Sequence, residues 1–135
     1  MTRLHRLHAE HGQSPWLDNL TRDSLEDGTL QDLIHAGVRG ITANPSIFAH
    51  AMSSSNAYTE QLDGLLQAGT LLEDVYWELV ITDITRAADM FAPLYKSSGG
   101  GDGFVSVEVS PEVADDTAAT IDHAGTCIRG STGPT

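Results

Sequence analysis

The sequence of residues 40–48 is Gly-Ile-Thr-Ala-Asn-Pro-Ser-Ile-Phe, and it predicts a short strand that passes directly into a helix. Asn44 suits the position before the helix, because its side-chain oxygen can accept an unpaired amide hydrogen of the first turn. Pro45 suits the first helical position, where a missing N–H costs nothing. Thr42 and Asn44 then share one face at the carboxyl end of the strand, where parallel α/β proteins usually carry their active sites.

Two further strands are predicted, over residues 16–20 and residues 104–109. A helical segment up to Ala36 separates the first strand from the central one, so the two strands should be parallel. The longest amphipathic pattern of the chain runs from Leu72 to Leu94 and leads toward the third strand. A glycine-rich stretch, residues 98–103, lies between them. It follows a helix, so we expect a flexible connector and not a phosphate loop.

The third strand alternates between apolar and polar side chains. Val105 and Val107 lie on one face, and Ser106 and Glu108 lie on the other. A solvent-exposed second face would explain this pattern. In a closed barrel the valines would instead face the helices, and the polar residues would point inward. Asp18 in the first strand allows the same two interpretations, a surface carboxylate or one directed into a polar pocket.

The composition excludes several classes of protein. The net charge of −12 argues against nonspecific binding to nucleic acid or to an anionic membrane. The single cysteine, Cys127, excludes an internal disulfide and suits a reducing cytosol, so we expect a cytoplasmic protein. No apolar run approaches the roughly 20 residues of a membrane span, and the N-terminus does not resemble a secretory signal.

The two ends of the chain raise separate questions. His5, His8 and His11 follow one another at helical spacing, which could suit a zinc ion. No carboxylate or cysteine cluster accompanies them, so a polar terminal helix is the preferred interpretation and no metal is expected. From Asp122 the hydrophobic pattern dissolves, and residues 122–135 are predicted to be a disordered or aberrant tail in which Cys127 has no catalytic role.

Each of the three predicted strands presents a polar residue at or near its carboxyl end, namely Asp18, Asn44 and Glu108. The carboxyl ends of parallel strands meet at one edge of a sheet, so these side chains should lie near one another. Two carboxylates can serve as acid and base, while an amide can hold a hydroxyl or carbonyl oxygen. This combination suits proton transfer on an oxygen-rich substrate.

Residues 16–20, 40–48 and 105–109 resemble, in this order, three motifs of the transaldolase family, and the resemblance extends over residues 3–121. The family's fold is a (β/α)₈ barrel, which typically takes about 250 residues. The resemblance therefore implies an α/β fold, a parallel barrel of TIM type, present here as an incomplete N-terminal part with about three strands. Residues 1–121 would form this domain.

The resemblance also implies a function. Transaldolases transfer a dihydroxyacetone unit between sugar phosphates, usually sedoheptulose 7-phosphate and glyceraldehyde 3-phosphate, in the pentose phosphate pathway. A lysine forms a Schiff base with the ketose, and the iminium accepts the electrons of the broken carbon–carbon bond. Neither a metal nor an organic cofactor is implied.

By match to the motifs, Asp18 and Glu108 are the expected acid–base residues, with Glu108 acting through a water molecule. Asn44, Thr42 and Ser106 are the expected substrate-binding residues. The family's lysine belongs to a fourth strand, beyond the part of the family pattern that this sequence carries. The chain's only lysine, Lys96, is predicted at a helix end and does not match it.

We therefore expect the N-terminal piece of a transaldolase that is inactive alone. The alternative is a non-catalytic half-barrel module, which binds a sugar phosphate or pairs with a complementary C-terminal half. The expected partners are thus a sugar phosphate and either that half or a second copy of the chain. A compact three-strand fold unrelated to the barrel is a third interpretation.

Overall fold

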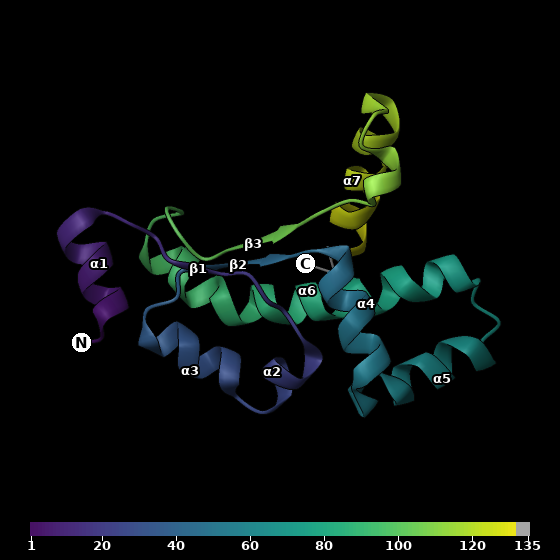
Figure 1. The fold of residues 1–135 in the computed structure, drawn as a ribbon, viewed down its shortest axis with the longest axis horizontal. Helices are drawn as coiled ribbons and strands as arrows, with labels where there is room; N and C mark the ends of the chain where they lie inside the picture. The colour runs from purple at the N-terminus through teal and green to yellow at the C-terminus, as the bar shows by residue number, and fades with distance from the viewer. Residues whose placement is uncertain (132–135) are drawn as a thin grey trace.

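The computed structural model describes residues 1–131, except the side chains of Glu73 and residues 126–131. A three-stranded parallel sheet in the order β1-β2-β3 lies at its centre, and helices connect the strands (Figure 1). The elements in chain order are α1 (Arg3–His11), β1 (Trp16–Leu17), α2 (Arg22–Glu26), α3 (Thr29–Ala36), β2 (Gly40–Ala43), α4 (Pro45–Ser54), η1 (Asn56–Tyr58), α5 (Thr59–Gln67), α6 (Leu72–Ser97), β3 (Phe104–Val107), η2 (Pro111–Val113) and α7 (Thr117–Ser131). The predicted α/β class and the parallel pairing are confirmed.

The junction between β2 and α4 forms as the sequence predicts. Asn44 is the N-cap of α4 and has extended backbone angles, and Pro45 occupies the first turn. The strand before it is almost entirely buried, with Ile41 and Ala43 facing the helices. Thr42 and Asn44 therefore lie at the carboxyl end of a buried strand.

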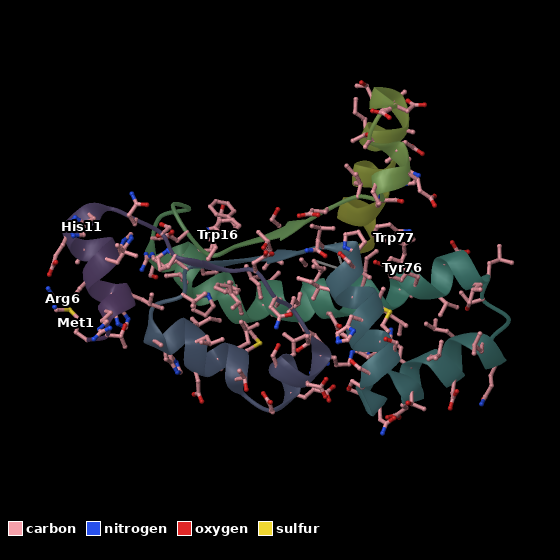
Figure 2. All side chains as sticks on the ribbon, in the orientation of Figure 1. Met1, Arg6, His11, Trp16, Tyr76 and Trp77 are labelled. Carbon is pink, nitrogen blue, oxygen red and sulfur yellow. The ribbon has the colours of Figure 1, made fainter. Side chains whose placement is uncertain are left out.

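Among the described residues, the core lies on one side of the sheet. Val80, Ile84, Ala87 and Phe91 of α6 pack with Ile41 in a single cluster. The helices α3 and α6 lie on the same side of the strands, whereas the labelled Trp16 projects from the opposite side (Figures 1 and 2). Val105 and Val107 pack against this core, so the valines face the helices as predicted. Ser106 and Glu108 are exposed on the opposite face, and the closed barrel stays a prediction.

The first and third strands are shorter than predicted. β1 ends at Leu17, because the chain then turns to bury Leu20, which has no exposed surface. The prediction of one continuous strand over residues 16–20 is therefore wrong beyond Leu17. β3 ends at Val107, although the backbone N–H of Glu108 still donates a hydrogen bond to the carbonyl of Ala43.

One helix continues through a proline, and another runs further than the sequence predicts. α6 continues through Pro93 to Ser97, because the carbonyl that loses its partner belongs to the exposed Asp89 and can be solvated. α7 continues past Asp122, where a disordered tail was predicted, so that expectation is wrong up to Ser131. The glycines in this part of the chain hide the helical pattern. Residues 132–135 lie outside the described part of the chain.

The glycine-rich stretch before β3 is not a loose connector. Asp102 is 5% exposed and accepts hydrogen bonds from Arg39, which precedes β2, and from Ser14, which precedes β1. The Arg39–Asp102 ion pair is 2.6 Å long. The backbone N–H of Gly103 also donates to the carbonyl of Arg39. These contacts fasten the amino ends of all three strands to one another.

No helix among residues 1–131 combines the length and the apolar character that crossing a membrane would need.

Candidate functional site

The site is built on the face of the sheet that the helices leave uncovered, called here the inner face. The strand register places Thr42 of β2 opposite Ser106 of β3, and the pairing of Leu17 with Ile41 brings the next residue, Asp18, beside Thr42. The hydroxyl of Thr42 donates a hydrogen bond of 2.6 Å to Oδ1 of Asp18. A carboxylate and two hydroxyls therefore form one row across the three strands.

Asn44 lies one step nearer the carboxyl end of the sheet. Its Oδ1 accepts hydrogen bonds from the backbone N–H of Ile47, at 3.0 Å, and from the hydroxyl of Ser46, at 2.8 Å. These bonds fix the side chain as the cap of α4. Nδ2 is the hydrogen-bond donor of the amide, and the cap uses Oδ1 alone. Nδ2 can therefore donate to an oxygen of a ligand.

Glu108 extends the same edge on the third strand. Its hydrogen bond to Ala43 carries the register one residue beyond β3, which places Glu108 next to Asn44. Glu108 and Ser106 are both exposed, whereas Thr42 is partly buried. The structure thus gathers all five predicted site residues on one face and at one end of the sheet.

The amino end of the inner face is aromatic, which sequence patterns did not reveal. The rings of Trp16 and Phe104 stack with centroids 6.4 Å apart, and the ring of Tyr95 meets Phe104 edge-on at 5.6 Å. Gly40 lies between the two stacked residues in the register. A β-carbon on Gly40 would come within 2.4 Å of the Trp16 ring, so only glycine leaves room for it.

A second unpredicted feature is a buried charged group behind the sheet. Arg22 and Asp83 are 3% and 0% exposed, and Nε of Arg22 donates to Oδ1 of Asp83 at 2.7 Å. The hydroxyl of Tyr58 donates to the other carboxylate oxygen at 2.9 Å. Burial raises the pKa of the Asp83 carboxyl, although the hydrogen bond and the charge of Arg22 oppose the rise. Burial also raises the pKa of Tyr58.

Lys96 does not belong to this site. It is exposed in the last turn of α6, which leads to the amino end of β3, whereas the site lies at the carboxyl ends of the strands. The ring of His5 contacts Thr2 in a capping box of α1, and Nδ1 of His8 donates to the carbonyl of Gln13. Within the described residues no group of three metal-binding side chains converges. The side chain of Cys127 is not among those described.

Comparison with known proteins gives one consistent result. The family model described as transaldolase/fructose-6-phosphate aldolase matches residues 15–130. A transaldolase of Thiobacillus denitrificans is 48% identical over 114 residues, which cover 84% of this chain and 32% of that protein. Transaldolase 1 of Streptomyces coelicolor is 44% identical over 117 residues, 86% of this chain and 31% of that protein.

Transaldolase 2 of Nostoc punctiforme is 42% identical over 116 residues, which cover 85% of this chain and 30% of that protein. The chain thus spans about a third of the length of the curated relatives it matches. The matched residues include the whole sheet and the polar edge of its inner face. The chain belongs to the transaldolase/fructose-6-phosphate aldolase family.

Proposed function

We propose that this chain carries the acid–base part of a transaldolase site, within the N-terminal part of a (β/α)₈ barrel. The observation behind the proposal is the row formed by Asp18, Thr42 and Ser106, with Asn44 and Glu108 beyond it at the carboxyl edge. In a closed parallel barrel this edge is the mouth, where active sites lie. The reaction is the transfer of a dihydroxyacetone unit between sugar phosphates, in the cytoplasm and the pentose phosphate pathway.

The proposed chemistry divides between carboxylates and neutral donors. Forming a Schiff base expels water from the ketose carbonyl, and cleaving the carbon–carbon bond removes a proton from a hydroxyl group. Both steps need groups that give and take protons, which Asp18 and Glu108 supply. The amide of Asn44 and the hydroxyls of Thr42 and Ser106 hold the substrate oxygens. No metal or organic cofactor takes part in this scheme.

The Schiff base itself needs a lysine on the inner face. Lys96, at the opposite end of the strands, is not placed to attack a carbonyl held near Asp18. We therefore propose that residues 1–135 alone are inactive and that the nucleophile comes from outside them. Borohydride reduction with fructose 6-phosphate tests this point. We expect no adduct in the intact mass, beside a trapped control from the Thiobacillus denitrificans transaldolase; a three-carbon adduct would overturn it.

A chimaera tests the roles of the carboxylates. Residues 15–121 would replace the matching part of the same transaldolase, and the assay would follow transfer to glyceraldehyde 3-phosphate. Asp18→Asn and Glu108→Gln should each reduce kcat by about 10²-fold or more, as expected for acid–base groups. Glu26→Gln, on the exposed surface of α2, is the matched control. An active chimaera that keeps its kcat in both variants would refute the assignment.

The second candidate is a non-catalytic half-barrel module, and the uncovered inner face favours it. Trp16 and Phe104 are each 42% exposed and stack on one another on that face, and adjoining exposed apolar side chains are typical of an interaction surface. Such a module would bind a sugar phosphate or pair with a complementary half or a second copy. Saturable binding of fructose 6-phosphate without turnover, both by the chain and by the chimaera, would favour this candidate.

A further inference from the structure

Three buried side chains hold the turn that follows the first strand. We call Arg22, Tyr58 and Asp83 the Arg22 network. The guanidinium of Arg22 donates to Asp83 and, at 3.3 Å, to the carbonyl of Leu79. The backbone N–H of Arg22 donates to the Tyr58 hydroxyl at 3.1 Å, and its guanidinium lies 4.3 Å from the centre of the Tyr58 ring. Both the backbone and the side chain of Arg22 are therefore fixed.

Arg22 stands four residues after Asp18, and the segment between them has little freedom. Leu20 is fully buried in the core, and the hydroxyl of Thr21 caps α2 by accepting the N–H of Ser24. On the other side, Leu17 is held in the sheet by its pairing with Ile41. The backbone of Asp18 is therefore set by anchors before and after it, and Arg22 is the charged one.

Stability alone does not explain these buried charges. Removing two ions from water often costs as much as their attraction returns, so apolar side chains could close the same space at no loss. The network joins α2 to α6, and these two helices are also joined at the surface by the ion pair of Arg86 and Glu26, 3.1 Å apart. The network adds a geometric constraint, because its hydrogen bonds form only when the turn between β1 and α2 has one position.

We propose that the Arg22 network positions the carboxylate of Asp18 on the inner face, so that it meets the hydroxyl of Thr42. The catalytic importance of this positioning rests on the proposed function. Displacing a reacting group by about 1 Å can cost on the order of 10²-fold in rate. Arg22, Tyr58 and Asp83 act through the backbone and do not touch the substrate.

The test measures the side-chain geometry of Asp18 and Thr42 by NMR, from the scalar couplings that report each χ1 angle. Tyr58→Phe removes one hydroxyl and keeps the ring. Arg22→Lys keeps the charge but loses the fork that reaches two partners. The control is Arg86→Gln, which breaks the surface pair between the same helices. All spectra are recorded without ligand and well below the melting temperature of each variant.

We expect a single χ1 rotamer for both residues in the unaltered chain and in Arg86→Gln. Averaged couplings for Asp18 are expected in Tyr58→Phe and in Arg22→Lys. The proposal is overturned if Tyr58→Phe melts earlier but keeps a single Asp18 rotamer, because the network would then only stabilise the fold. It is equally overturned if Arg86→Gln averages Asp18 as strongly, or if the unaltered chain already shows averaging.

This outcome is independent of the reaction. The couplings need neither substrate nor a Schiff base, so an inactive chimaera would refute the proposed function and leave the positioning result standing. Conversely, averaged χ1 couplings of Asp18 in an active chimaera would refute the positioning and leave the proposed function intact.

Discussion

Asp102 joins the amino ends of the three strands, so Asp102→Asn should weaken the whole sheet. The carboxylate is 5% exposed and receives hydrogen bonds from Arg39 and Ser14. The substitution keeps one acceptor oxygen but leaves the Arg39 side chain, itself 16% exposed, without a counter-charge. Breaking a fully buried pair costs about 3–5 kcal/mol. Since Arg39 can reach some water, we expect a loss of about 2–3 kcal/mol.

The effect should depend on pH in a defined direction. Burial by itself would raise the pKa of Asp102, but the hydrogen bonds from Arg39 and Ser14 and the charge of Arg39 lower it below its ordinary value of 3.8. The folded chain then binds fewer protons than the unfolded chain near that pH. The stabilisation by Asp102 is therefore fully present above about pH 4–5 and is lost as the pH falls through the lowered pKa.

Urea unfolding followed by circular dichroism measures both effects. The free energy of unfolding of Asp102→Asn is compared with that of the unaltered chain from neutral pH down to the acid limit of folding. The control is Glu26→Gln, whose pair with Arg86 is 40–48% exposed and should be worth less than about 1 kcal/mol. Equal losses of stability in the two variants at neutral pH would show that Asp102 does not hold the sheet as described. A loss from Asp102→Asn that grows as the solution is acidified would contradict the lowered pKa.

Three further substitutions probe separate features. Gly40→Ala should push the Trp16 ring out of its stack, because the new β-carbon would lie 2.4 Å from it; a reduced near-ultraviolet dichroism at a cost of about 1–3 kcal/mol is expected, and an unchanged signal would contradict the close approach. Leu30→Ala removes a fully buried side chain from the core and should cost about 2–5 kcal/mol in urea unfolding, with a loss below 1 kcal/mol counting against the packing. Pro93→Ala restores a hydrogen bond to the Asp89 carbonyl within α6 and should raise the melting temperature; a lower melting temperature would show that the proline fits the helix better than alanine.

Local signals in the sequence predicted the elements whose determinants are close together in the chain. The cap at Asn44 and the proline after it marked the start of α4. The alternation of residues 104–107 predicted that Val105 and Val107 face the helices, which the structure confirms. The predicted site residues lie on one face for the same reason, since the period of a strand and the parallel order of the sheet follow from the chain alone.

The ends of the elements were less predictable, because they depend on what the chain meets next. β1 stops at Leu17 since Leu20 is drawn into the core, and no pattern within five residues reveals that. α7 extends past Asp122 through residues of low helix propensity, and the contacts of this helix with α6 are not visible in the sequence.

The sequence by itself determined the parallel α/β class, the polar carboxyl edge and the membership of a family. Only the tertiary structure decided which distant residues support that edge. Arg22 meets Asp83 across 61 positions of the chain, and Ser14 meets Asp102 across 88. Such contacts produce no periodic pattern in the sequence, because each partner by itself resembles an ordinary surface charge or hydroxyl. Their burial becomes visible only when the helices are folded onto the sheet.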